Sequence, residues 1–299
     1  MTESGPRIAV VGVGGGWSSE ALADAFYEKT GTRILVEMKH VVFDAAAGAL
    51  YYGDVDLCKL DAVVVKKIGE VYSPDMLDRL DLLRFVADSG VPVFSKPLSM
   101  LRLLDRLSCT LTLRQAAIPM PPTVVTEDLS HARAAVESFG TAVLKPLYST
   151  KARGMRVLSA TDGGDLDEEL RDFQSEGNPV IYIQQKIDIP DRDLGVVYMG
   201  GEHVGTYARV GAEGSWNTTI RDGGRYERAD ASARTLAVAQ RAQAAFDLDF
   251  TSVDVVETDD GPIVFEVSAF GGFRGLRDGL QIDAADRYAD YVLGRLAHG

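Results

Sequence analysis

A predicted β-hairpin near the end of the chain constrains its fold more than any other feature of the sequence. Two apolar runs flank residues 259–261, and the glycine at the last of these positions supplies the positive φ that a three-residue turn needs. This turn pairs Thr258 with Pro262 and therefore sets Asp254 directly opposite Glu266. Like charges at facing positions destabilise a sheet, so the hairpin requires a compensating cation.

A divalent metal ion is one such cation. Mg²⁺ is usually held by one or two carboxylates together with phosphate oxygens and water. Because Asp254 and Glu266 lie inside strongly apolar strands, where unpaired acids are costly, we predict that they bind a metal. The alternative is that both carboxylates face solvent or pair with neighbouring arginines.

Composition restricts the class of protein. The 299 residues are 46% hydrophobic and 25% charged, an ordinary globular composition with enough chain for two cores. A net charge of −13 argues against nucleic acid or an anionic membrane as the main partner. Cys58 and Cys109 stand far apart, which disfavours a disulfide framework or a zinc site. The sequence has neither a bilayer-spanning apolar run nor a signal-peptide pattern, so we expect a cytoplasmic protein.

The order of the predicted elements divides the chain in two. Up to residue 97, strands alternate with helical patterns, which predicts a small parallel α/β domain. Its expected strands are residues 7–11, 33–37, 61–65 and 91–94. One helical run then extends from Leu98 to a proline-rich stop at residues 118–122. Beyond it, strands joined by a Gly200-Gly201 turn predict α+β structure with antiparallel sheets.

Lys145 ends an apolar strand and precedes a loop with two more cations, Lys151 and Arg153. A lysine that leaves a buried strand loses hydration, which an anionic ligand such as phosphate would offset. Backbone amides and the two loop cations are suited to cover a triphosphate. The alternative is a lysine that reaches solvent or an acidic partner. The sequence contains no Walker loop.

A glycine loop at residues 12–16 follows the first strand and resembles part of a dinucleotide-binding fingerprint, with Glu37 at the end of the next strand. Trp17 occupies the place of the third glycine, where helix and strand must pack closely. The loop is equally compatible with a tight turn or with a site for another small anion.

A polar stretch with Trp216, Asn217 and Arg221 separates two predicted sheets, and its simplest interpretation is a surface loop. Arg209 ends the strand before it. There its guanidinium either stabilises a negatively charged intermediate or pairs with one of the many acidic residues.

Several segments together resemble the ATP-grasp superfamily, and within it the RimK-like branch of carboxylate–amine ligases. The similar segments are residues 65–69, 91–94, 105–123, 143–146, 182–185, 192–201 and 271–273, with Arg209, Asn217, Gly223 and Gly224 at later positions. Asp254 and Glu266 fall where this family places its magnesium carboxylates. The resemblance extends over nearly the whole chain.

The resemblance implies an N-terminal parallel α/β (pre-ATP-grasp) domain over residues 1–97, followed by an ATP-grasp fold of two α+β subdomains, residues 98–184 and 185–299. It also implies a reaction. ATP phosphorylates a carboxylate to an acyl phosphate, which an amine attacks to give an amide, ADP and phosphate. The implied partners are small-molecule or peptide carboxylates and amines, and the resemblance is compatible with a homo-oligomer.

The resemblance assigns roles to individual residues. The implied nucleotide-binding residues are Arg106, Lys145, Lys151, Arg153, Tyr182, Ile183, Gln184, Gln185, Asp193 and Asn217. Arg209 and Lys145 are the implied catalytic residues. The implied ligands of Mg²⁺ or Mn²⁺ are Asp254, Glu266 and Ser268.

Three positions depart from the family pattern. Ser268 stands in place of an asparagine, Arg106 in place of a lysine, and Gly195 in place of an arginine for which Arg192 is a candidate substitute. These departures keep open an ATP-grasp kinase or a nucleotide-binding regulatory protein without ligase activity. The glycine loop keeps open a dinucleotide-binding protein.

Overall fold

The structure of the protein, a computed structural model, describes residues 5–150, 152–161, 163–189, 192–212, 218, 220 and 223–298. In this part of the chain, no helix has the length and apolarity needed to cross a bilayer.

The N-terminal part is built on a parallel four-stranded sheet, as predicted. Its strands run in the order β2 (Ile34–Val36), β1 (Ile8–Val11), β6 (Ala62–Val65) and β7 (Val93–Phe94), and the main helices are α1 (Trp17–Thr30) and α2 (Asp75–Asp88). Every residue of β1 is buried, which is typical of a parallel strand covered on both faces.

A small antiparallel sheet between β2 and β6 was not predicted. It consists of β3 (Val42–Asp44), β4 (Ala49–Tyr52) and β5 (Val55–Asp56), with the 3₁₀ helices η1 (Met38–His40) and η2 (Leu57–Lys59) on either side. All three residues of β3 are exposed, so this strand lacks the alternation of polar and apolar residues from which a strand is predicted.

The second sheet is antiparallel and carries two helices. Its order is β10 (Arg156–Ser159), β9 (Thr141–Lys145), β11 (Ile181–Gln185) and β8 (Thr123–Thr126), and its helices are α5 (Leu129–Phe139) and α6 (Leu166–Ser175). The core between sheet and helices includes the fully buried Leu170, Phe173 and Ile183.

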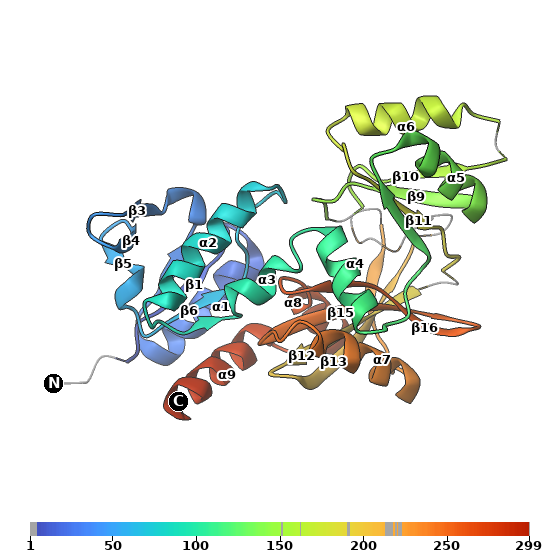
Figure 1. The fold of residues 1–299 in the computed structure, drawn as a ribbon. Coiled ribbons are helices and arrows are strands. Elements are labelled where there is room, and N and C mark those ends of the chain that lie inside the picture. The colour runs from blue at the N-terminus through green and yellow to red at the C-terminus, as the bar shows by residue number, and fades with distance from the viewer. Residues whose placement is uncertain are drawn as a thin grey trace.

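The third sheet has five antiparallel strands. Their order is β14 (Arg225–Arg228), β13 (Glu202–Val210), β12 (Arg192–Met199), β15 (Phe250–Thr258) and β16 (Gly261–Ser268), with helices α7 (Ala233–Ala244) and α8 (Phe273–Leu280). The last helix, α9 (Ala284–His298), returns to the N-terminal domain and packs against α1 (Figure 1).

The continuous helix predicted from Leu98 is wrong. The segment forms two helices, α3 (Pro97–Leu101) and α4 (Arg106–Gln115). The Asp105 carboxylate caps α4 by accepting a 2.8 Å hydrogen bond from the amide of Ser108, so a new helix begins there. Helices α3 and α4 lead from the first sheet to the other two (Figure 1).

The β15–β16 hairpin places Asp254 opposite Glu266, as predicted, but by a different route. The three-residue turn is wrong, because Thr258 pairs with Gly261 and leaves only two residues in the turn. Phe265 is an extra residue in β16, and this bulge shifts the register by one before Glu266. The turn has one residue fewer than predicted and the bulge adds one residue, so Asp254 still pairs with Glu266.

We propose residues 97 and 184 as the domain boundaries, because the strands of each large sheet then fall within one segment, apart from Gln185 at the end of β11.

A buried lysine joins the first sheet to the third. Lys66 follows β6, is 2% exposed, and donates a 2.6 Å hydrogen bond to the carbonyl of Phe270, beyond β16. Its ammonium group lies 4.1 Å from the centre of the Phe273 ring. Burial, with a smaller effect of Lys67, lowers the pKa of Lys66 from 10.5 to about 7.

This lysine should make stability depend on pH. Above the folded-state pKa the unfolded chain binds one more proton at Lys66, so stability rises with pH. Between about pH 7 and 9, we expect the free energy of unfolding of the wild type to rise relative to Lys66→Met by up to about 1.4 kcal/mol per pH unit. Urea denaturation at several pH values measures this difference. The exposed Lys96→Met variant is the control, and parallel wild-type and Lys66→Met curves would contradict the prediction.

Candidate active site

A cleft of about 740 Å³ lies between the three large sheets. Its walls include Lys66 from the first sheet, Lys145 and Gln184 from the second, and Asp254 and Glu266 from the third. This volume is within the range of small-molecule sites, about 300–1,000 Å³.

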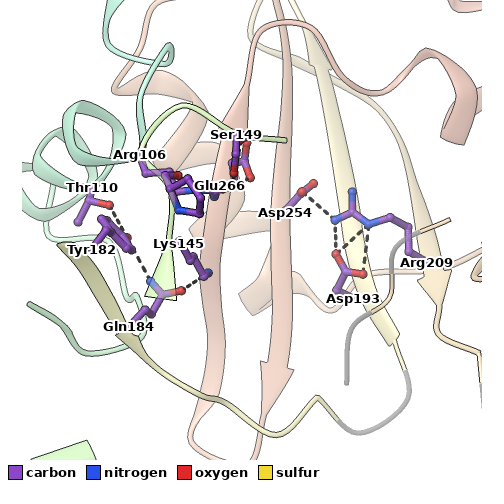
Figure 2. Close-up of polar contacts among 11 residues, drawn as sticks. Arg106, Thr110, Lys145, Ser149, Tyr182, Gln184, Asp193, Arg209, Asp254 and Glu266 are labelled. Carbon is purple, nitrogen blue, oxygen red and sulfur yellow. Dashed lines mark hydrogen bonds and ion pairs between the residues drawn. The ribbon is translucent and has the colours of Figure 1, made fainter. Parts of the chain in front are cut away.

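A row of acidic residues crosses the floor of the cleft. Asp254 on β15 faces Glu266 on β16, and Asp193 lies on the neighbouring strand β12. The Arg209 guanidinium lies between Asp254 and Asp193 (Figure 2); it is 2.8 Å from Asp254 and donates a 3.0 Å hydrogen bond to Asp193. Burial raises the pKa of Asp254 above its usual value, against the opposing effect of Arg209. Of the two alternatives for Arg209, the structure shows the pairing with acidic residues, and the side chain also lines the cleft.

Arg106 lies on the other side of this row. Its guanidinium is 3.5 Å from Glu266 and donates 3.1 Å hydrogen bonds to the carbonyls of Pro146 and Ser149. Arg106 on α4 thereby holds the loop after β9 close to β16 (Figure 2).

Lys145 reaches into the same space from the end of β9. Its ammonium group donates a 2.5 Å hydrogen bond to the side chain of Gln184 and lies 5.6 Å from the centre of the Phe265 ring. Burial and, to a smaller extent, the nearby Arg106 together lower the pKa of Lys145 to about 7, against the opposing effect of Glu266. An anion bound beside Lys145 would oppose both effects and favour the charged form.

The β11 residues assigned to nucleotide binding face different environments. Gln184 and Gln185 line the cleft. Tyr182 is buried behind Gln184 and shares a 2.8 Å hydrogen bond with Thr110. Ile183 points the other way, into the core under α5 and α6, because neighbouring residues of a strand face opposite sides.

The remaining predicted residues are placed as follows. The exposed Arg153 lines the cleft. Lys151 and Asn217 lie outside the described residues, as do Trp216 and Arg221. Ser268 also lines the cleft, but its hydroxyl oxygen accepts hydrogen bonds from the amides of Phe270 and Gly271, both at 3.1 Å.

The donor set suits a hard cation that completes its shell with other oxygens. Within the described ranges, no group of three or more His, Cys, Asp or Glu side chains is arranged so that it could hold a metal ion without other ligands. Two facing carboxylates beside the cations Lys145 and Arg106 nevertheless fit Mg²⁺, which keeps water and phosphate oxygens as its other ligands.

Sequence reasoning missed Lys66 as a cleft residue. It comes directly after β6, at the carboxyl end of a parallel strand, where open α/β sheets place their ligands. The position of Lys66 directly after a predicted parallel strand was the signal from which its place in the cleft could have been predicted.

The glycine loop uses its amides internally. Val13 donates a 3.1 Å hydrogen bond to the Ser19 hydroxyl, and Gly15 donates a 2.7 Å hydrogen bond to the Glu20 carboxylate. The Trp17 ring stacks against Arg277, whose Cζ atom lies 3.9 Å from the ring centre. Because the Ser19 hydroxyl and the Glu20 carboxylate already accept these two hydrogen bonds, which a pyrophosphate would otherwise accept, the geometry disfavours a dinucleotide.

Comparison with curated proteins finds ligases of similar length. The chain is 24% identical over 307 residues to the tetrahydromethanopterin:alpha-L-glutamate ligase of Methanosarcina acetivorans, covering 92% of this chain and 95% of that protein. It is also 24% identical over 251 residues to the ribosomal protein bS6–L-glutamate ligase of Escherichia fergusonii, covering 83% and 81%.

Solved structures share the fold. A RimK domain ATP-grasp protein from Sphaerobacter thermophilus has a TM-score of 0.75 and 26% identity, covering 96% of this chain and 100% of its own. The ATP-grasp ligase PsnB, complexed with a minimal precursor, Mg and ADP, has a TM-score of 0.73 and 19% identity over 99% of both chains. The predicted ATP-grasp fold is therefore confirmed. Residues 104–292 match the RimK-like ATP-grasp domain, and because this match spans more than half of the chain, the protein belongs to the RimK-like ATP-grasp family.

Proposed function

We propose that the protein is an ATP- and Mg²⁺-dependent ligase that joins a carboxylate to an amine through an acyl phosphate. The observation that carries this proposal is the cleft itself, in which two facing carboxylates lie beside basic side chains from separate elements. Family membership and the ligases among its relatives support the same reaction class.

The nucleotide would lie between the second and third sheets. Lys145 and Arg106 would contact its phosphates, with Arg153 on the covering loop, while Gln184 and Gln185 would line the adenine end. Tyr182 would support Gln184, to which it is hydrogen-bonded at 3.3 Å. Phosphate charge near Lys145 would offset its burial and keep the ammonium group protonated.

Asp254 and Glu266 would hold the metal, which when bound would neutralise part of the phosphate charge. Ser268 would be the weakest of the three ligands, because its oxygen already accepts two backbone hydrogen bonds.

Arg209 would stabilise the developing acyl phosphate. Asp193 is 4% exposed and holds the guanidinium in place before substrate arrives. Charge that is fixed in advance stabilises a transition state without reorganisation during the reaction.

The relatives named as glutamate ligases, and PsnB in complex with a peptide precursor, favour amino-acid or peptide substrates. The net charge of −13 still argues against nucleic acid as a partner. The free thiols of Cys58 and Cys109 fit a reducing compartment, so we propose a cytoplasmic location.

An assay with purified protein, ATP, Mg²⁺ and pooled amino acids tests the ligase directly. Amino acids carry both a carboxylate and an amine, so one mixture supplies both substrate classes. We expect ADP release that requires the amino acids. ADP release at the same rate with and without amino acids would instead favour a nucleotide-binding protein without ligase activity.

The metal site makes a mutational prediction. Asp254→Asn and Glu266→Gln should each abolish Mg²⁺-dependent ATP turnover while leaving the far-UV circular dichroism spectrum unchanged, because each removes a charged ligand and not an apolar contact. Asp259→Asn, at the exposed turn of the same hairpin, is the matched control. Wild-type turnover in both site variants would remove these residues from the mechanism.

Lys145 makes a second prediction, on binding. Lys145→Met should weaken ATP affinity at least about tenfold, the loss expected for one charge-assisted hydrogen bond of about 1.5–3 kcal/mol. Isothermal titration calorimetry measures this change, with Lys96→Met, an exposed lysine outside the cleft, as the control. Equal affinities of the two variants would contradict the assignment.

A further inference from the structure

A tyrosine ring at the cleft fills a slot between two glycines, and a third glycine lies beside its Cβ atom. Tyr207 on β13 is 3% exposed. A Cβ atom on Gly195 would lie 2.2 Å from the Cζ atom of this ring, and one on Gly275 would lie 2.3 Å from Cε1 or Cζ. A Cβ atom on Gly279 would lie 3.1 Å from the Cβ of Tyr207. The ring therefore occupies space that exists only because β12 and α8 carry glycines there.

The slot directs the phenol group toward the row of acids. Tyr207 pairs with Gly195, Gly195 pairs with Asp254, and Asp254 pairs with Glu266, so these residues form one row across four strands. Directly paired residues share a face of the sheet. The phenol oxygen lies 2.5 Å from the position of a Gly195 Cβ, which places it over β12 and next to Asp254.

This geometry explains the glycine at position 195. A long side chain there would collide with the Tyr207 ring, so an arginine at 195 and this tyrosine conformation exclude one another. Arg192 does not substitute for such an arginine, because it is exposed at the start of β12. The side chain that reaches the acids from this part of the sheet is instead Tyr207, two residues before Arg209 on the same face.

The phenol has the chemistry of a neutral hydrogen-bond donor. Burial raises the pKa of Tyr207 well above its usual value of 10, so the hydroxyl keeps its proton at neutral pH. The side chain of Ser252, also on the cleft wall, lies close to it. A neutral donor beside the cation Arg209 can contact an anionic oxygen without adding another charge to be compensated.

We propose that the Tyr207 hydroxyl donates a hydrogen bond to the substrate carboxylate as it is phosphorylated, and that Gly195 is the residue that makes room for it. This inference rests on the proposed ligase function. Tyr207 would then be a catalytic residue, with Arg209 supplying the charge and Tyr207 the neutral donor.

Tyr207→Phe is the decisive variant, because it retains the ring that fills the slot and removes only the hydroxyl. With ATP, Mg²⁺ and pooled amino acids, we expect kcat for ADP release to fall about 10²-fold, the usual loss for one donor at a developing oxyanion. ATP affinity and the melting temperature should stay unchanged. Tyr198→Phe is the matched control, since that hydroxyl donates to the Leu236 carbonyl and Tyr198 does not line the cleft.

Gly195→Ala provides a second test, because Gly195 is the residue that pairs with Tyr207 on the neighbouring strand. Its Cβ should displace the phenol and lower kcat by a similar factor, and the double variant with Tyr207→Phe should be no slower than the slower single variant. A Tyr207→Phe enzyme as fast as the wild type would overturn this inference and leave the ligase function standing. A wild type without amino-acid-dependent turnover would overturn both.

Discussion

Two carboxylates that face each other across β15 and β16 set the conditions for the rest of the site. A sheet tolerates such a pair only when positive charge lies within a few ångströms. Here Arg209 approaches Asp254 from β13, and Arg106 approaches Glu266 from α4. Arg106 and Glu266, which are more than a hundred positions apart in the sequence, thus lie side by side in the fold.

The compensating cations also connect the parts of the molecule. Arg106 holds the loop that follows Lys145, so the same side chain that faces Glu266 positions a loop that lines the cleft. Lys66 performs a similar task by joining the end of the first sheet to the Phe270 carbonyl beyond β16. Because buried ammonium groups lose hydration, Lys66 and Lys145 would each gain from an anionic ligand in the cleft.

The sequence alone correctly predicted that Asp254 faces Glu266, but not the turn and the bulge of the hairpin that bring them together. Alternation along β15 and β16 placed Asp254 against Glu266, yet the bulge at Phe265 leaves no signal in composition and only the paired strands reveal it. Lys145 was accessible to prediction because an apolar strand ended there. Motif resemblance grouped Ile183 with its neighbours, whereas strand alternation alone indicates that its side chain turns into the core, where the structure places it.

Other features depend on contacts that only a folded chain contains. The break between α3 and α4 rests on a single cap at Asp105 within an otherwise helical pattern. The slot around the Tyr207 ring requires Gly195 from β12 and Gly275 from α8, and no local rule connects these positions. Such compensations between distant residues are the part of a site that motif comparison misses.

The most direct test of the central claim is a crystal structure of the protein with Mg²⁺ and a non-hydrolysable ATP analogue. The account predicts electron density for the metal between the carboxylates of Asp254 and Glu266, and triphosphate oxygens within hydrogen-bonding distance of Lys145. A nucleotide bound at the glycine loop of residues 12–16, with no metal between the two carboxylates, would contradict it.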